Sequence, residues 1–370
     1  MKAVDFILPS LIVGGAEKMT ILLAEQFRND GWEVRFVIRR KQESMYHEVV
    51  GREFALVDLE ADRVRSFPTA LYKFYQRHRP PDLVIASLWP LTFLTTTVLR
   101  ALRAPTQVIT IEHGSLKYRV ANKRALYRSF LINSLRWTMR LGSKVVAVSE
   151  GLRDEIATLT AYSGPNLVAI PNPIEISEPR EGSEAAARAT ALARQLKGPV
   201  LLSVGRLKKV KNLPLLLRGF ARLLSATDRA TLLIVGDGVE MNRLKELSQT
   251  LGISDHVHFL GFIEDCAPYY TMADIFTLTS DSEGFGNVIV EALMAGCTVV
   301  STDCDYGPRE ILKDQEYGYL VPVGDELALA KALQMAISHP VPPDKSTSRG
   351  EDFTPHNIYR QYQQLIQSKP

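Results

Sequence analysis

The chain has 370 residues, 46% hydrophobic and 23% charged, which is typical of a globular protein with more than one domain. No apolar run reaches the roughly 18 residues of a transmembrane helix, and the chain begins with a strand-like run instead of a secretory signal. The three cysteines lack metal-ligand spacing, so we expect a reducing, cytoplasmic location and no structural metal.

Strand-like and helix-like segments alternate along most of the chain, the pattern of parallel α/β sheets. Many of the strand-like runs are apolar throughout, as expected for strands covered on both faces. They span residues 5–8, 34–38, 83–86, 107–111 and 144–148, and then 200–204, 231–235, 256–260, 275–279 and 298–301. Helical segments follow most of them, for example 16–29, 68–77 and 213–224.

The break between two halves is visible in the composition. Pro171-Asn172-Pro173 ends the first set of elements, and the polar, alanine-rich residues 175–198 indicate a linker with a short helix. A second linker-like run, 340–346, precedes a last amphipathic segment at 358–366. We therefore expect an α/β fold of two Rossmann-like, doubly wound domains, residues 1–172 and 173–352, facing across a cleft. Residues 353–370 should form a helix that packs back on the first domain.

A basic segment stands out in the first half. Residues 1–174 carry 24 Lys+Arg and 16 Asp+Glu, a balance of +8, whereas residues 175–370 have a balance of −5. From His113 to Ser149 there is no acid, and eight basic residues occur, among them Lys117, Arg119, Lys123, Arg124 and Arg128. Aromatic and aliphatic residues alternate with these cations, largely at helical spacing over residues 122–141.

This pattern predicts a helix that lies on an anionic membrane surface. The alternative is a helix whose apolar stripe faces the domain core while its arginines are solvated. A nucleic-acid surface is a further possibility, but no RNA- or DNA-binding motif is present.

Two carboxylates flank a glycine-rich turn in the second half, in the run Glu283-Gly284-Phe285-Gly286-Asn287-Val288-Ile289-Val290-Glu291. The pattern becomes helical from Asn287, so Glu283 precedes a helix N-terminus and Glu291 lies one turn inside it. Free N–H groups at that terminus favour a phosphate, and the carboxylates can accept hydrogen bonds from hydroxyls. The turn therefore suits a nucleotide sugar, although a plain strand–loop–helix junction would have the same pattern.

Three further motifs follow expected strands. Gly14-Gly15 opens the first helix and could bring amides to a phosphate, or form only a tight turn. In Gly205-Arg206-Leu207-Lys208-Lys209-Val210-Lys211, Arg206 and Lys211 could neutralise a diphosphate, whereas Lys208 and Lys209 fit a solvated loop. His113 could contact a ligand or be an ordinary loop histidine. Asp303-Cys304-Asp305 is too common a pattern to predict a metal site.

Together these motifs resemble a GT-B-fold retaining glycosyltransferase of glycosyltransferase family 4, of the bacterial surface-polysaccharide type. The resemblance extends over nearly the whole chain. It depends on an ordered set: Gly205-Arg206-Leu207 with Lys211, Val235-Gly236-Asp237-Gly238, Phe259-Leu260-Gly261-Phe262, Ala273-Asp274-Ile275-Phe276, the Glu283…Glu291 motif and Gly307-Pro308-Arg309-Glu310. One departure is Thr298, in an expected turn where the family commonly has proline.

The resemblance implies a role for each motif. Residues 1–172 would form the acceptor side and 173–352 the nucleotide-sugar side. Arg206 and Lys211 would hold the donor diphosphate, and Glu291 the ribose hydroxyls. Glu283 and the amides of Phe285, Gly286 and Asn287 would hold the donor sugar, contacted also by His113, while Gly15 would approach the diphosphate. No cofactor or bound metal would be required.

The expected substrates are a UDP-N-acetylhexosamine or UDP-hexose donor and a lipid-linked sugar acceptor. The enzyme would act in the cytoplasm, peripherally at the inner face of the cytoplasmic membrane. The alternatives are a GDP-mannose-dependent mannosyltransferase, a sugar-nucleotide epimerase or sucrose-type synthase acting on soluble sugars, and a binding protein on the same fold.

Overall fold

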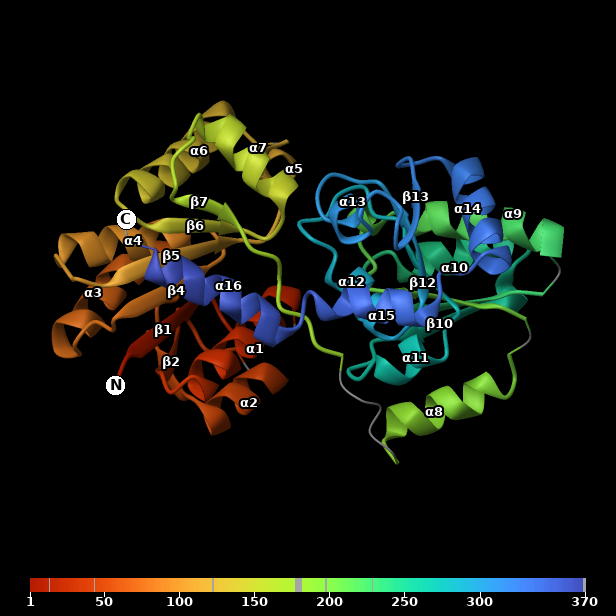
Figure 1. The fold of residues 1–370 in the computed structure, drawn as a ribbon, viewed down its shortest axis with the longest axis horizontal. Helices are drawn as coiled ribbons and strands as arrows, with labels where there is room; N and C mark the ends of the chain where they lie inside the picture. The colour runs from red at the N-terminus through yellow and green to blue at the C-terminus, as the bar shows by residue number, and fades with distance from the viewer. Residues whose placement is uncertain are drawn as a thin grey trace. The chain divides into compact units, whose positions relative to one another are not determined.

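The computed structural model describes residues 1–12, 14–42, 44–121, 123–176, 182–196, 198–227 and 229–368. The chain divides into two compact units (Figure 1). Unit 1 comprises Met1–Pro173 and Thr354–Pro370, and unit 2 comprises Ile174–Phe353. Each unit has one parallel sheet flanked by helices, which is the architecture that the alternating pattern predicts.

Unit 1 contains a sheet in the order β3-β2-β1-β4-β5-β6-β7. Its strands are β1 (Ala3–Leu8), β2 (Glu33–Ile38), β3 (Ala55–Asp58), β4 (Leu83–Ser87), β5 (Gln107–Glu112), β6 (Lys144–Ala147) and β7 (Leu167–Ala169). Its helices are α1 (Gly15–Asn29), α2 (Met45–Glu53), η1 (Val64–Ser66), α3 (Phe67–Arg77), α4 (Leu91–Ala101), α5 (Leu116–Val120), α6 (Ala125–Arg140), α7 (Glu150–Thr160) and α16 (Pro355–Gln367).

Unit 2 contains a sheet in the order β10-β9-β8-β11-β12-β13. Its strands are β8 (Val200–Val204), β9 (Thr231–Val235), β10 (Val257–Gly261), β11 (Ile275–Leu278), β12 (Thr298–Thr302) and β13 (Gly318–Val321). Its helices are α8 (Glu184–Ala193), η2 (Lys209–Lys211), α9 (Leu213–Thr227), α10 (Met241–Thr250), η3 (Ser254–His256), α11 (Ala267–Thr271), α12 (Asn287–Met294), α13 (Pro308–Ile311), α14 (Glu326–Ser338) and α15 (Pro343–Glu351).

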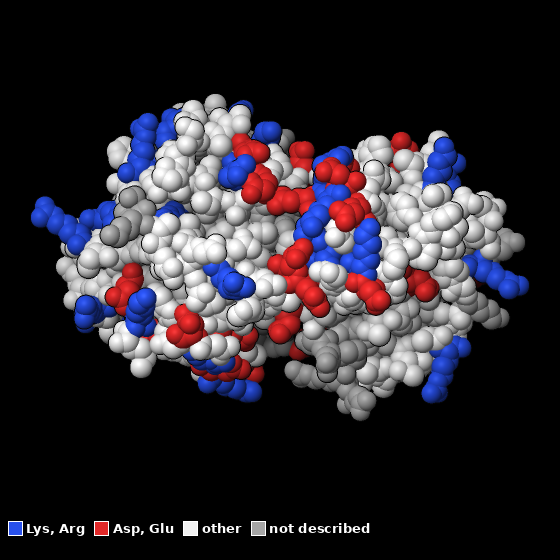
Figure 2. All heavy atoms as spheres, in the orientation of Figure 1, with Lys and Arg blue, Asp and Glu red and all other residues white. Residues whose placement is uncertain are grey.

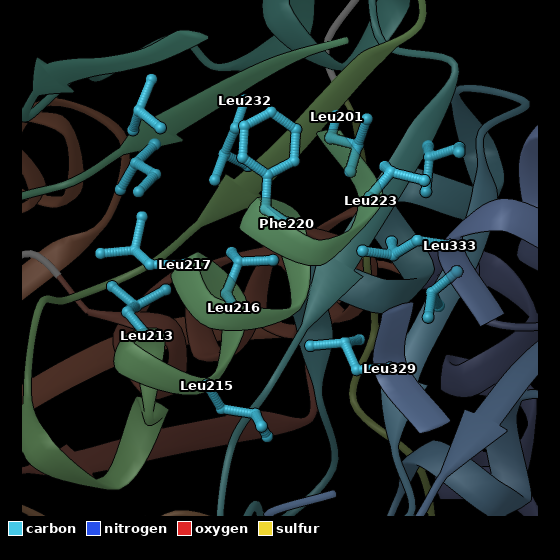
Figure 3. Close-up of a cluster of buried hydrophobic side chains, with 14 of the residues drawn as sticks. Leu201, Leu213, Leu215, Leu216, Leu217, Phe220, Leu223, Leu232, Leu329 and Leu333 are labelled. Atoms are coloured by element: carbon cyan, nitrogen blue, oxygen red, sulfur yellow. The ribbon is translucent and has the colours of Figure 1, made fainter. Parts of the chain in front are cut away.

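Leucine-rich α9 forms the centre of the unit 2 core. Leu216 and Phe220 are fully buried, and Figure 3 shows them between leucines of β8 and β9 on one side and of α14 on the other. The 3–4-residue spacing of these side chains places them on one helix face. This apolar packing fixes the helix that follows the Gly205–Lys211 loop, and so fixes the end of that loop.

The last helix, α16, packs on unit 1. The Tyr359 ring packs edge-on against Phe27 of α1, with ring centroids 4.8 Å apart, and its hydroxyl donates to Asp30 Oδ2 at 2.7 Å. The buried Lys144 Nζ donates to the carbonyl oxygens of Leu365 (2.7 Å) and Ser368 (2.9 Å). These carbonyls at the end of a helix have no helical donor, so the lysine caps the helix.

Two local predictions are wrong. The run 340–346 is not a linker throughout, because Pro343 is the first residue of α15, where its missing N–H has no cost. Thr298 does not lie in a turn: it is the first, buried residue of β12, and its N–H donates to Asp274 O at 3.1 Å. Proline could not make this bond.

Strand order sets where ligands can bind. In unit 2 the order reverses between β8 and β11, which makes their carboxyl ends a topological switch point. The loops after these two strands touch: Asp281 N donates to Val210 O at 2.8 Å. In unit 1 the reversal lies between β1 and β4.

Close backbone packing constrains the loop before α12. Gly307 has φ +96°, and a Cβ built on it would lie 1.7 Å from the carbonyl oxygen of Phe285. A β-bridge between Ser282 and Asp305 holds the same two segments together. Only glycine at position 307 lets the loop at 285 come this close.

We expect Gly307→Ala to destabilise unit 2 more than the matched change Gly324→Ala. Both glycines have positive φ, but nothing lies within 4 Å of a Cβ on Gly324. Gly324→Ala should therefore cost only the ~1–2 kcal/mol of a left-handed backbone. Gly307→Ala should cost about 1–3 kcal/mol more, because the loop must move. Urea unfolding of both variants measures the difference, and equal midpoints would contradict this account.

Candidate active site

The loops after β8 and β11 are joined by an ion pair. Lys211 Nζ lies 2.6 Å from Glu283 Oε1, and the two side chains are only 24% and 13% exposed. Lys211 ends the short η2 turn, and Glu283 precedes the glycine turn. The sequence predicts both residues as ligand contacts, and the structure brings them together.

Local hydrogen bonds fix the orientation of this pair. Ser280 Oγ donates to Glu283 Oε1 at 2.6 Å, and Thr279 Oγ1 donates to the carbonyl oxygen of Lys211 at 3.1 Å. Ser280 is completely buried. Sequence reasoning missed Ser280, although a polar residue at the end of an apolar strand and three positions before Glu283 is a usable signal.

Glu291 is held from a different direction. It lies on α12, one turn after the N-terminus, and its Oε2 accepts a hydrogen bond from the Tyr270 hydroxyl at 2.9 Å. Tyr270 is 1% exposed, and burial together with the Glu291 charge raises its pKa well above the usual value. Tyr270 therefore stays protonated and donates its hydrogen bond to Glu291. It belongs to α11, and no local pattern links it to Glu291.

The turn before α12 places backbone amides beside Glu283. Gly286 is the N-cap with φ +102°, and Asn287 is the first helical residue. The buried Phe285 ring packs edge-on against Phe353 at 5.5 Å between centroids, which anchors the turn. Helix N-termini of this kind bind anions, because their first N–H groups lack partners in the helix.

Two glycines bring the loops after β8 and β9 together. A Cβ on Gly236 would lie 1.9 Å from the carbonyl oxygen of Gly205, so only glycine fits there. Arg206 follows Gly205, is exposed, and lines a small pocket together with Lys211. The cations predicted to meet a diphosphate thus lie at the switch point, with a glycine loop beneath them.

In unit 1 the predicted residues follow β1 and β5. Gly15 is the first residue of α1, and Gly14 is its N-cap. His113 comes directly after β5. Both of its ring nitrogens are buried and have no hydrogen-bond partner among the described residues. Burial, aided by the Arg119 cation, lowers its pKa to about 4, so near neutral pH the ring offers one donor and one acceptor.

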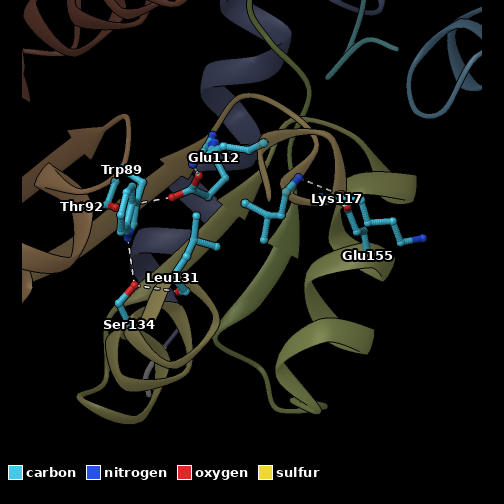
Figure 4. A network of polar contacts seen from close by, with 9 residues as sticks. Trp89, Thr92, Glu112, Lys117, Leu131, Ser134 and Glu155 are labelled. Atoms are coloured by element: carbon cyan, nitrogen blue, oxygen red, sulfur yellow. Dashed lines mark hydrogen bonds and ion pairs between the residues drawn. The ribbon is translucent and has the colours of Figure 1, made fainter. Parts of the chain in front are cut away.

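Two buried carboxylates, both missed by sequence reasoning, hold the segment after His113 (Figure 4). Glu155 on α7 accepts from Ser115 Oγ and from the amides of Leu116 and Lys117, at 2.6–3.2 Å. Fully buried Glu112 pairs with Arg119 at 3.4 Å, and burial raises its pKa despite that cation. α5 is therefore fixed at its first turn by Glu155 and at its second by Glu112.

The basic segment separates into a core face and an outer face. Leu131, Leu135 and Met139 of α6 are buried, and α6 packs on α4 and α7. Leu126, Phe130 and Trp137 lie on the outer face and are 53–85% exposed. Lys117, Lys123, Arg124 and Arg128 are exposed, whereas Arg119 is half-buried in its ion pair. In Figure 2 the atoms over α6 are white and blue, and red atoms begin over α7.

Other chemistries find less support in the part of the chain that the structure describes. Those residues contain no group of three or more His, Cys, Asp or Glu side chains placed to hold a metal. Burial raises the pKa of Cys297 and of Cys304 to about 12, so neither thiol is a ready nucleophile. No described helix is both long enough and apolar enough to span a bilayer.

Comparisons with known proteins agree with this geometry. Residues 13–178 match the family model described as Glycosyltransferase Family 4, and residues 188–352 match the one described as Glycosyl transferases group 1. The structure of Anabaena Alr3699/HepE in complex with UDP aligns over 100% of both chains, with a TM-score of 0.80 and 18% identity. That likeness establishes the fold.

Two curated relatives align over parts of the chain. The lipopolysaccharide core biosynthesis glycosyltransferase LpsE of Rhizobium meliloti is 33% identical over 177 residues, which is 46% of this chain and 51% of LpsE. A Campylobacter jejuni N-acetylgalactosamine-N,N'-diacetylbacillosaminyl-diphospho-undecaprenol 4-alpha-N-acetylgalactosaminyltransferase is 41% identical over 139 residues, 38% of this chain and 37% of that enzyme. The matched regions thus span about half or less of these relatives.

The two family models match successive halves of the chain, and each half contains one parallel sheet. The chain therefore belongs to the group 1, family 4 glycosyltransferases and has the GT-B fold.

Proposed function

We propose that the enzyme transfers a sugar, with retention, from a UDP-sugar to a lipid-linked sugar acceptor in polysaccharide or glycan biosynthesis. UDP-N-acetylhexosamine is the favoured donor and UDP-hexose the next. Two relatives support this class, because one is named for lipopolysaccharide core synthesis and the other for N-acetylgalactosamine transfer to a diphospho-undecaprenol acceptor. The UDP bound to HepE supports the choice of base.

The observation that carries the proposal is the Lys211–Glu283 ion pair beside the glycine-capped N-terminus of α12. A cation, a carboxylate and helix amides meet there within one switch point. A diphosphate takes the cation and amides, and sugar hydroxyls donate to the carboxylate. Glu291, held by Tyr270, lies one turn further along α12 and suits the ribose hydroxyls.

In the proposed reaction Arg206 and Lys211 stabilise the charge that develops on the leaving diphosphate. The bond from the anomeric carbon to the diphosphate oxygen breaks, and the acceptor oxygen bonds to that carbon on the same face. The acceptor proton passes to the departing phosphate oxygen, so no enzymic nucleophile is needed. Neutral His113 is proposed to hydrogen-bond the donor sugar, and the amide of Gly15 to approach the diphosphate. No metal is required.

The outer face of α5 and α6 is proposed to rest on the inner leaflet of the cytoplasmic membrane. Tyr118, Leu126, Phe130 and Trp137 are 57%, 85%, 53% and 57% exposed. In the same segment of the chain, Lys117, Lys123, Arg124 and Arg128 are also exposed. Apolar side chains among cations suit an anionic interface, and attachment there would bring the enzyme to a lipid-linked acceptor.

We expect Arg206→Ala and Lys211→Ala each to lower kcat by about 10²–10³-fold, the typical effect of removing one fixed transition-state contact. Glu291→Ala should chiefly raise the donor KM, because ribose contacts are equal in ground and transition states. Sugar transfer and slow donor hydrolysis would be followed with UDP-N-acetylglucosamine, UDP-N-acetylgalactosamine, UDP-glucose and GDP-mannose, with and without EDTA.

Lys331→Ala, an exposed cation on α14, is the matched control and should leave kcat unchanged. Near-wild-type kinetics of a folded Arg206→Ala variant would refute the assigned role. A preference for GDP-mannose would show that the proposed UDP-sugar is not the donor. Thermal stabilisation by a nucleotide sugar without turnover would favour a binding protein. Inhibition by EDTA that Mg²⁺ reverses would refute metal independence, and an inverted product would refute retention.

We also expect the protein to co-sediment with phosphatidylglycerol vesicles at low salt and to be released at high salt. Replacing Lys123, Arg124 and Arg128 together by Glu should weaken this binding at least about 100-fold, since each cation contributes roughly 1 kcal/mol. The control replaces Arg63, Arg65 and Lys73, which are exposed elsewhere in unit 1, by Glu. If both variants lose vesicle binding equally, or if the protein does not bind vesicles at low salt, α6 is an ordinary solvated helix.

A further inference from the structure

A second basic pocket lies in unit 2, beside the donor loop but not part of it. It has a volume of about 180 Å³. Four cations and two acids line it: Lys208, Lys209, Arg218, Arg243, Glu240 and Asp281. Arg206 and Lys211 do not line it, and they face the small pocket under Gly205 instead. The loop from 205 to 212 therefore presents cations to two separate pockets.

The cations of the second pocket exceed its acids. Glu240 Oε2 accepts from Arg243 Nη1 at 3.0 Å, and Asp281 Oδ1 accepts from Asn212 Nδ2 at 2.8 Å. No acidic side chain within 4 Å neutralises Lys208, Lys209 or Arg218 among the residues that the structure describes. An anion in the pocket would thus meet three unpaired cations, and it would relieve their mutual repulsion.

Backbone geometry adds to this positive potential. The pocket lies where α9 and α10 begin, since Leu213 and Pro214 of α9 and Glu240, the N-cap of α10, all line it. Because their N-termini line the pocket, these helices of 15 and 10 residues direct the positive ends of their dipoles toward it. Side chains and helix dipoles therefore act in the same direction.

We propose that this pocket binds a phosphate or diphosphate group separately from the donor nucleotide. Arg218 can donate a bidentate pair to phosphate oxygens, and the two lysines can act as mobile point charges. The net excess of two positive charges matches a doubly charged phosphate better than a single carboxylate. The volume is below the ~300–1,000 Å³ of pockets that enclose a drug-sized molecule, which favours a free phosphate, a pyrophosphate or one phosphorylated end of a larger molecule.

The pocket shares a wall with the donor loop. Lys209 faces the pocket, and Lys211, two residues later in the same η2 turn, pairs with Glu283. The bonds from Asp281 N to Val210 O and from Asn212 Nδ2 to Asp281 lie between them. An anion that orders Lys209 would therefore also order the turn that carries Lys211.

Isothermal titration with pyrophosphate, and with inorganic phosphate in parallel, tests the proposal on the full chain at constant ionic strength. Saturating UDP is present to occupy the donor site. We expect Lys209→Gln and Arg218→Gln together to weaken pyrophosphate binding at least tenfold. Lys331→Gln and Lys245→Gln, two exposed lysines of unit 2 outside the pocket, serve as the charge-matched double control and should not change it.

Lys211→Ala separates the two sites. Binding that survives Lys211→Ala and is lost with Lys209→Gln and Arg218→Gln supports the second site. Three results would each overturn the proposal. They are pyrophosphate binding no stronger than that of chloride, loss of pyrophosphate binding when Lys211→Ala or UDP is the only change, and equal weakening of that binding in the control variant. Should Arg218→Gln not fold, Lys208→Gln with Lys209→Gln changes only exposed side chains and makes the same prediction.

Discussion

The Lys211–Glu283 ion pair is the contact on which the candidate site depends. It joins the loops after β8 and β11, the two strands between which the sheet order reverses. Because parallel strands end at the same edge, these loops meet without any long connection. The pair itself is half-buried, so removing one partner would leave the other charge poorly solvated. In the proposed function, a diphosphate would meet at Lys211 a cation that the ion pair already holds in place, and a sugar would meet a carboxylate that Ser280 already orients.

Glycine makes this arrangement sterically possible. Gly236 lies against the carbonyl oxygen of Gly205, and Gly307 lies against that of Phe285. A Cβ atom on either glycine would overlap that oxygen. Each close approach holds the loop after one strand against the loop after the neighbouring strand. The glycines at these two positions are thus required by backbone packing, in addition to any room that the proposed ligand would need. A glycine motif read from sequence alone cannot separate these two causes.

Much of the fold follows from sequence because apolar strands and helical spacing alternate so regularly. The elements that escaped are instructive. β3, β7 and β13 have only 4, 3 and 4 residues, and each lies at the edge of its sheet. Such short, partly buried segments lack a distinct period. α15 escaped because its polar residues and prolines resemble a linker, whereas its buried side, including Ser346 and Gly350, packs on α12.

Prediction of the site's side chains from the sequence is limited in the same way. Spacing places Glu283 and Glu291 on either side of a helix start, and Lys211 after an expected strand. It cannot identify Tyr270, Glu112 or Glu155, because their partners are set by tertiary packing 21, 7 and about 40 residues away.

On α6 the sequence cannot show which apolar side chains face the core. Apolar residues occur on both faces of that helix, so periodicity cannot divide them. Packing divides them: Leu131, Leu135 and Met139 are buried where α6 packs on α4 and α7, whereas Phe130 and Trp137 remain more than half exposed. Packing in the core accounts for the first set alone, and the proposed membrane contact is an account of the second.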